Sequence, residues 1–347
     1  MHREYRAGAI HSDERHHRWL FDDNPDNGAE GPQYWIYQKE GTIHGQQAGI
    51  PFALFVNGAA RRASWAINLK VTPAYQMRGI GGVLSEIYLR DNEVTAAVNV
   101  TEAARKAFLR AGWEFLGRIP KYVRPLRTAG IRAGLPGALR GLAPLFYPLL
   151  LVVDGWWWSY LRLHGFRMEP VAAFDPRIDQ VWNEASDAYP VVGRRDYTRL
   201  RWRFDAAPDP RRYHRFYLFQ GGRLSGYAVL RYSIRNGRRV AVVVDFLCPP
   251  RLLRALFALC LQQARHAGMD DLQTVMCHCP GRTGTLLSLG FLQRDSSEHE
   301  FLVHYGKEED VTRHLLGNRH NWFVTMADCD LEWMFLREHE TEPEQQV

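Results

Sequence analysis

The feature that most limits the fold of this chain is a strand-like segment that turns through glycines directly into a helix. The strand-like segment is Ser64–Val71, and apolar residues recur at helical spacing from Val83 to Tyr88. Between them lies Gln76–Gly82, which we call the glycine loop. At such a junction several free backbone N–H groups converge, with the positive end of a helix behind them. The junction therefore predicts an α/β (α+β) fold with an anion site of the kind that holds phosphate.

The pattern Gln76-x-x-Gly79-x-Gly81 resembles the pyrophosphate loop of the GNAT N-acetyltransferase superfamily, which holds acetyl-coenzyme A. A Cβ at either glycine would block the close approach of phosphates. An ordinary glycine-rich turn is the alternative. The resemblance implies an acyltransferase that uses acetyl-CoA as acyl donor and needs no metal. The residues that it implies as cofactor contacts are Leu69, Val71, Gln76, Met77, Arg78, Gly79, Ile80, Gly81, Gly82 and Asn99.

The order of elements repeats along the chain. Hairpin strands, the glycine loop, two helices and a last strand at Phe115–Leu126 form a GNAT-type unit over residues 15–127. Residues 128–166 predict an apolar linker. Residues 167–335 then repeat the order around a core strand at Arg239–Leu247, which predicts a second, degenerate unit.

The second copy lacks the glycine loop. After its core strand it has Cys248-Pro249-Pro250-Arg251, in which proline removes N–H donors and no glycine admits phosphate. Two GNAT-like units in one chain resemble tandem GNAT proteins. The combination of Arg18-Trp19-Leu20, Leu200–Phe204 and Asn321–Asp330 looks like bacterial tandem acetyltransferase-like proteins associated with surface-polysaccharide biosynthesis. A more distant similarity is to the Fem-type aminoacyl and peptidyl transferases.

The usual proton-transfer groups are replaced. Asn68 stands where the family often has a basic carboxylate, and Phe108 stands where it often has an acidic tyrosine. Asp245, at about the position of Asn68 in the second copy, is either a ligand or base for the substrate amine or a structural carboxylate bonded to an arginine. The weaker substitutes are Tyr122, Glu114, Tyr34 and Tyr75, for which core, rim or surface positions are the alternative.

Basic side chains give further candidates. Arg78 is expected to face the diphosphate, and Arg105 and Lys106 the 3′-phosphate, unless they belong to a solvated helix face. An arginine run suits either phosphate recognition or a solvated surface. It comprises Arg194, Arg195, Arg199, Arg201, Arg203, Arg211, Arg212 and Arg215.

The linker contains two very apolar stretches, Leu145–Val153 and Trp156–Trp158. Pro148, Asp154 and Gly155 interrupt them, which argues against a bilayer span. Arginines before the stretches and tryptophans after them suit a segment at a membrane interface. We favour the other interpretation, a helix that packs into the cleft between the two units.

Composition limits the partners. The net charge of +6 comes from arginine, because the 347 residues include five lysines. We expect an anionic small molecule or a membrane surface rather than nucleic acid. Five irregularly spaced cysteines, with no signal peptide visible, predict reduced thiols in the cytoplasm, and a peripheral position at the inner face of the membrane stays open. Cys277-His278-Cys279 alternates along a strand and is poorly arranged for a metal.

Three functions follow from these patterns. The first is an acyl-CoA-dependent N-acyltransferase that acetylates a primary amine, such as an amino sugar of a surface polysaccharide. The second is a Fem-like aminoacyl or peptidyl transferase, which would use charged tRNA and need no diphosphate cradle. The third is a non-catalytic, CoA-binding or membrane-associated scaffold.

Overall fold

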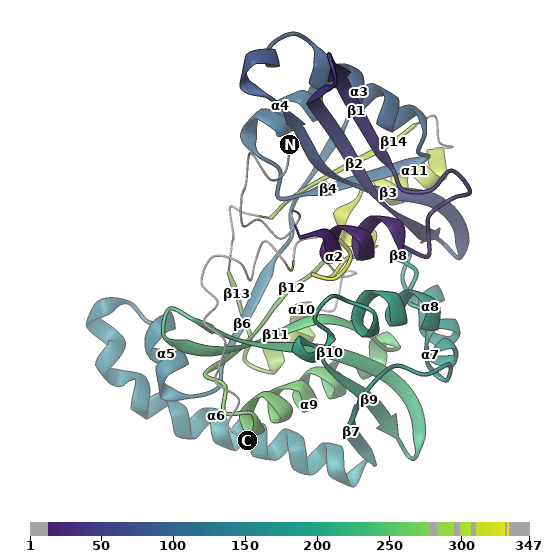
Figure 1. Cartoon of the computed structure of the whole chain (residues 1–347). Helices are drawn as coiled ribbons and strands as arrows, with labels where there is room; N and C mark the ends of the chain where they lie inside the picture. The colour runs from purple at the N-terminus through teal and green to yellow at the C-terminus, as the bar shows by residue number, and fades with distance from the viewer. Residues whose placement is uncertain (1–12, 278–282, 295–298, 307–309, 330–331, 333–347) are drawn as a thin grey trace.

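The chain folds around two mixed sheets that stack end to end (Figure 1). The computed structural model describes residues 13–277, 283–294, 299–306, 310–329 and 332. The expected mixed α/β class is confirmed, with two mixed sheets in one chain. One apolar core runs through both sheets, and a smaller one lies under the helices of the first sheet.

The first sheet has eight strands among the described residues, and β1 (Tyr34–Lys39) pairs with residues 42–48 of β2, on the edge where β8 pairs with residues 54–56. Along the path the strands are β15 (Trp322–Phe323), β8 (Val191–Gly193), β2 (Thr42–Val56), β3 (Ala59–Val71), β4 (Val94–Val98), β14 (Glu300–Tyr305) and β5 (Glu114–Arg118). Helices α3 (Ile80–Arg90) and α4 (Glu102–Arg110) cover one side, where Tyr88 and Phe108 are buried against Ala66, Ala97 and Leu302.

The second sheet has seven strands among the described residues. In order they are β13 (Leu292–Arg294), β6 (Lys121–Pro125), β12 (Asp271–Val275), β11 (Arg238–Leu247), β10 (Arg223–Arg235), β9 (His214–Gln220) and β7 (Phe166–Val171). The long helix α9 (Leu253–His266) packs on this sheet. Shorter helices surround both sheets: α7 (Ile178–Ala185), α10 (Thr283–Ser288) and α11 (Asp310–Leu316).

The two sheets exchange strands. β6 comes from the first half of the chain but pairs with β12 and β13 in the second sheet. β14 comes from the second half but pairs with β4 and β5 in the first sheet. The single strand expected over Phe115–Leu126 is therefore wrong, because its two ends, β5 and β6, belong to different sheets. The domain limits at residues 127 and 167 stay a prediction, but neither sheet is complete within them.

A matched pair of short helices joins the two halves. α2 (Glu14–His17) runs into the π-helical turn η2 (Arg18–Asp22), and α8 (Tyr197–Leu200) runs into the π-helical turn η6 (Arg201–Asp205). The underlying sequences are RWLFDDNPD at residues 18–26 and RWRFDAAPD at residues 201–209. This match in sequence and conformation supports the expected internal repeat.

Trp19 and Trp202 meet at this junction. The Nε1–H of Trp19 donates to the carbonyl of Trp202 at 2.8 Å, and the Nε1–H of Trp202 donates to the carbonyl of Trp19 at 2.8 Å. The rings stack with centroids 5.2 Å apart. Both side chains are buried, so each bond satisfies a polar group that water does not reach. We call this pair the tryptophan clasp.

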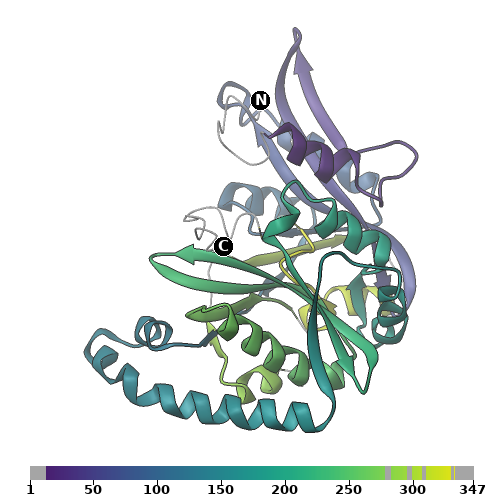
Figure 2. The ribbon, with the colours of Figure 1, turned by 60° about the horizontal axis from the view of Figure 1, so that its bottom comes forward.

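The expected linker is largely helical. It forms α5 (Thr128–Gly134), a 3₁₀ turn η4 (Gly137–Leu142) and α6 (Ala143–Leu163), with Pro148 inside α6. α6 lies along the outer edge of the second sheet's half, farthest from β1–β3 in both views (Figures 1 and 2). Of the most apolar 18-residue stretch within residues 137–163, only 11% is buried. The expectation that this helix fills the cleft between the units is wrong, because it packs on α9 and β7 and leaves its other face exposed.

The clasp can be tested by Trp19→Phe, which keeps an aromatic ring but leaves the Trp202 carbonyl without its donor. A buried carbonyl without a partner costs about 1–3 kcal/mol, and we expect the free energy of unfolding in urea to fall by that amount. Trp156→Phe, at an exposed tryptophan of α6, should change it by less than about 0.5 kcal/mol. Equal losses in the two variants would contradict a structural role for the clasp.

Candidate functional site

β3 separates from β4 half-way along its length. The parallel pairing covers Ala63 to Trp65 on β3 and ends there, although β3 continues to Val71. A bulge lies at this point, where the β2–β3 register shifts between Gln46 and Ala48. Because a bulge bends its strand, β3 forms no pairing with β4 beyond Trp65, and we call this interruption of the pairing the gap.

Asn68 forms the bulge. Its φ of 56° lies in the left-handed region, where asparagine is tolerated better than most residues. The side chain of Gln47 supports the bulge by donating to the carbonyl of Ile67 at 3.1 Å. The left-handed backbone conformation at the bulge thus favours asparagine at position 68 for a structural reason.

The glycine loop joins the end of β3 to α3. The Gln76 amide donates to the carbonyl of Val71 at 3.0 Å, which fixes the loop to the strand. Gly79 is the N-cap of α3 with φ of 80°, a conformation that suits glycine. The N–H of Val83 bonds to the carbonyl of Gly79 at 3.1 Å, so helix geometry leaves the N–H groups of Ile80, Gly81 and Gly82 without an intrahelical acceptor.

The space in front of these donors is open. A Cβ on Gly79 or Gly82 would meet nothing within 4 Å. Three free N–H groups at the positive end of an eleven-residue helix form a cradle for an anion. The structure thus brings the glycine loop and the end of β3, with Leu69 and Val71, together as expected.

Two loop residues, Arg78 and Met77, lie at the rim of the loop. Arg78 does not extend in front of the helix: its guanidinium lies 5.1 Å from the ring centre of Tyr75. Tyr75 in turn stacks on His44 with ring centroids 3.9 Å apart. Met77 is fully exposed at a positive φ of 60°. Arg78 is therefore held at the side of the loop.

The opposite rim of the gap is the end of β4. Asn99 follows β4 with φ of 53°, and its N–H donates to the carbonyl of Glu300 at 3.0 Å. On α4, Arg105 pairs with Glu300 at 3.3 Å and Lys106 pairs with Glu102 at 2.7 Å. Both candidates for the 3′-phosphate thus already have a carboxylate partner.

Of the substitute acids and bases, Tyr75 lies beside the glycine loop, stacked on His44, and the others lie away from it. Phe108 is buried and stacks on Trp113 with centroids 4.5 Å apart. Tyr122 is buried in β6, and so belongs to the second sheet. Tyr34 is in β1, where burial raises the pKa of its hydroxyl to about 12. Glu114 is exposed on β5 and hydrogen-bonds to Tyr305.

The second sheet has a matching gap, which the chain itself fills. Pairing of β11 with β12 ends at Val242, and a bulge follows between Asp245 and Val243. Val324 then pairs with Cys277 beyond the end of β12, and the N–H of Ala327 donates to the carbonyl of Val244 at 3.2 Å. Residues 324–328 thus lie between the separated strands, where the first sheet leaves a gap. Together with Pro249 and Pro250, this explains why the second copy has no anion cradle.

Asp245 locks this segment in place. It accepts from Tyr227 at 2.7 Å, Thr325 at 2.8 Å and Arg195 at 3.1 Å, and Arg195 also pairs with Asp328 at 2.5 Å. Of the two interpretations, the structure matches the structural carboxylate bonded to an arginine.

The rest of the arginine run is largely internal as well. Arg194 and Arg199 pair with Asp26, Arg203 with Glu332, and Arg215 with Asp205. Arg201 and Arg211 are exposed, and Arg212 pairs with Asp209 at the surface. The run as a whole therefore matches neither a phosphate site nor a solvated face, because its buried arginines form ion pairs with acidic residues of the same chain.

His44 was missed by the sequence analysis. β2 begins at Thr42 and brings His44 beside the glycine loop, where its carbonyl accepts from the N–H of Thr72 at 2.8 Å. Residues 42–52 contain two glycines and a proline and show no regular alternation, so their pattern offered no clear signal for this part of the strand. Among the described residues no group of three His, Cys, Asp or Glu side chains is placed to hold a metal, and His278 and Cys279 lie outside them.

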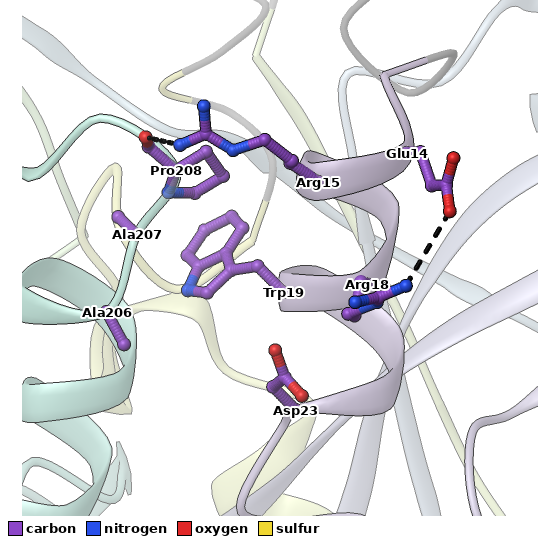
Figure 3. Close-up of a pocket in the computed structure, with 8 residues that line it drawn as sticks. All are labelled: Glu14, Arg15, Arg18, Trp19, Asp23, Ala206, Ala207 and Pro208. Carbon is purple, nitrogen blue, oxygen red and sulfur yellow. Dashed lines mark hydrogen bonds and ion pairs between the residues drawn. The ribbon is translucent and has the colours of Figure 1, made fainter.

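A separate hollow of about 340 Å³ borders the tryptophan clasp (Figure 3). Trp19 and Asp23 line it, and Arg15 reaches over it to donate to the carbonyl of Pro208 at 2.6 Å. It contains none of the expected site residues, so it is a feature of the junction between the repeats.

Comparison with solved structures supports the fold. A GCN5-related N-acetyltransferase from Anabaena variabilis superposes with a TM-score of 0.55 at 13% identity, over 79% of this chain and 62% of that one. The N-myristoyltransferase of Saccharomyces cerevisiae with bound myristoyl-CoA gives 0.51 at 13% identity, over 82% and 72%. No family model and no curated protein sequence matches the chain. In fold, the chain is similar to GNAT acyltransferases, including one built from two units.

The role of Asp245 can be tested by Asp245→Asn. The change keeps Asp328 as a charged partner of Arg195 but removes the negative charge that Arg195, Tyr227 and Thr325 bond to, and we expect the free energy of unfolding to fall by about 1–3 kcal/mol. Asp209→Asn breaks a partly exposed pair and should cost less than about 1 kcal/mol. Unchanged stability in Asp245→Asn, measured by urea denaturation, would return Asp245 to the catalytic candidates.

Proposed function

We propose that this chain is an acyltransferase that moves an acyl group from acyl-coenzyme A to the primary amine of a small molecule. Acetyl-CoA is the donor that we favour, and an amino sugar of surface-polysaccharide assembly is the first acceptor class to test. The observation that carries the proposal is the gap between β3 and β4, which leads to the open first turn of α3. The similar yeast protein holds myristoyl-CoA, which supports an acyl-CoA donor.

The residues around the gap fit such a donor. The N–H groups of Ile80, Gly81 and Gly82 would hold the diphosphate. Leu69 to Val71, on the edge of β3 that β4 has left, would offer backbone N–H and C=O groups to the amides of the pantetheine arm, as in strand pairing. Asn99 stands on the opposite rim. Acyl-CoA supplies an acyl group already activated as a thioester.

The chain itself contributes positioning. Asn68 and Phe108 cannot exchange a proton at neutral pH, and Tyr122 and Asp245 are buried in the second unit. We therefore assign the loss of the amine proton to bulk water, and the rate gain to the alignment of the amine with the thioester. The second unit would shape the acceptor side.

The residues at positions 68 and 108 favour a second function, a protein that binds acyl-CoA without turnover. Positions 68 and 108 lack the usual base and acid, and Phe108 is committed to its stack with Trp113. The two functions share the cradle and differ in chemistry, so binding and turnover need separate tests.

Binding can be tested by calorimetric titration with acetyl-CoA, for which we expect micromolar affinity. Gly82→Asp puts a carboxylate in the first turn of α3, which helix polarity favours, so the fold should persist. The new charge would repel the diphosphate and weaken binding at least about thirtyfold. Gly284→Asp, at an equally open glycine in the first turn of α10, should bind as the wild type does. Absence of binding by the wild type, or equal affinity in Gly82→Asp, would contradict the assigned site.

Turnover can be tested by thiol release from acetyl-CoA with a panel of amino sugars. We expect release that depends on the acceptor and is lost in Gly82→Asp. Because no side chain of the chain is assigned as base, the rate should rise with pH as the acceptor amine loses its proton. Tight binding with no release on any amine would favour the non-catalytic function.

A further inference from the structure

The outward face of α6 is apolar. A helix that packs one side against a protein body ordinarily presents polar residues on the other. Here Leu145, Leu149, Val152, Trp156 and Leu163 recur at helical spacing and are 60–84% exposed. Their neighbours Leu142, Phe146, Leu151 and Tyr160 are exposed as well. We call the first five residues the α6 stripe. A continuous apolar surface of this kind marks an interaction site.

The opposite face of α6 holds the helix to the body. Asp154 is buried and pairs with Arg124 at 2.8 Å and with Arg265 of α9 at 2.5 Å. The indole N–H of Trp158 donates to the carbonyl of Ala258 at 3.3 Å. The charge thus points inward and the apolar side chains point outward, which reverses the usual arrangement of a surface helix.

Charge along the segment that carries the stripe has one sign. Asp154 is the only acidic residue of residues 119–168, and its two arginines neutralise it. Arg127, Arg132 and Arg140 precede the stripe and Arg162 lies in its last turn, and all four are exposed. Arginines at both ends and aromatic rings at one end of an apolar helix match the headgroup region of a bilayer that contains anionic lipids.

We propose that the α6 stripe docks on an anionic membrane surface, with α6 lying in the plane of the interface. The helix has 21 residues, so it offers a nearly straight contact about 30 Å long. In both views α6 lies farthest from β1–β3, so a docked protein would keep the glycine loop in water, accessible to a soluble donor (Figures 1 and 2). The proposal does not depend on the proposed function.

A spanning orientation is the first alternative. Residues 137–163 are long and apolar enough to cross a bilayer by length and composition. Crossing would pull α6 from α9 and leave Asp154, Arg124 and Arg265 without their partners, which costs several kcal/mol for each buried charge. Docking in the interface keeps these contacts and buries the same apolar residues.

The test is flotation of the full chain with vesicles of phosphatidylcholine, alone or with about one third phosphatidylglycerol. We expect stronger binding to the anionic vesicles, falling with added salt. Leu149→Glu with Val152→Glu should reduce binding at least about tenfold, because two apolar side chains are lost from the lipid contact. Ile36→Glu, at a 47% exposed isoleucine of β1, is the matched control and should bind as the wild type does. Both positions of the double variant are exposed, so an unchanged circular dichroism spectrum should show that it folds.

A charge variant separates the two contributions. Arg132→Ser with Arg140→Ser should weaken binding to anionic vesicles and leave binding to neutral ones unchanged. Three results would overturn the proposal. The first is a wild type that floats with neither kind of vesicle, and the second is a double glutamate variant that floats as the wild type does. The third is a lipid-free wild type that is a dimer by light scattering while the double glutamate variant is a monomer, because a second copy of the chain would then cover the stripe. Resistance of the membrane-bound chain to extraction by alkaline carbonate would overturn the in-plane orientation in favour of a span.

Discussion

The reciprocal exchange of β6 and β14 is the constraint on which the rest of the structure depends. Each strand lies between two strands of the other half, so neither sheet closes without the other. The two halves of the chain are therefore joined by hydrogen-bonded strands within each sheet, and not only by side-chain contacts between two separately folded domains. The tryptophan clasp then fixes the repeats at a second point, where each indole satisfies the carbonyl of the other. A site on one unit is thereby held rigidly relative to the other.

The two similar units differ where their core strands end. Both core strands bulge and leave the next strand, so both sheets open a gap. In the second unit residues 324–328 enter the gap, and the ion pairs of Asp245, Arg195 and Asp328 secure them. In the first unit β3 continues into the glycine loop and the first turn of α3 remains open. The repeat therefore yields one copy with an open helix N-terminus, the proposed anion cradle, and one closed structural copy.

The sequence predicted what local patterns control. The glycine loop, the two helices that follow it and the missing loop after β11 were all anticipated, because spacing, glycine and proline act within a few residues. Strand exchange was not, because β5 and β6 look like one strand until their partners are known. The pairs of Arg194 and Arg199 with Asp26 join residues about 170 positions apart, which no local pattern reveals. The tryptophan clasp had a signal, the match of residues 18–26 to 201–209.

α6 shows why apolar composition alone did not settle the place of a segment. Hydrophobic residues predict burial, and the sequence does not say whether protein or lipid buries them. The single charge decides the orientation: Asp154 needs partners, and Arg124 and Arg265 lie on the body, so this face turns inward. The stripe on the other side is then left outward, framed by exposed arginines. Because Asp154 must face the protein body to reach its arginine partners, the α6 stripe on the opposite side of the helix faces outward, where a bilayer could bury it.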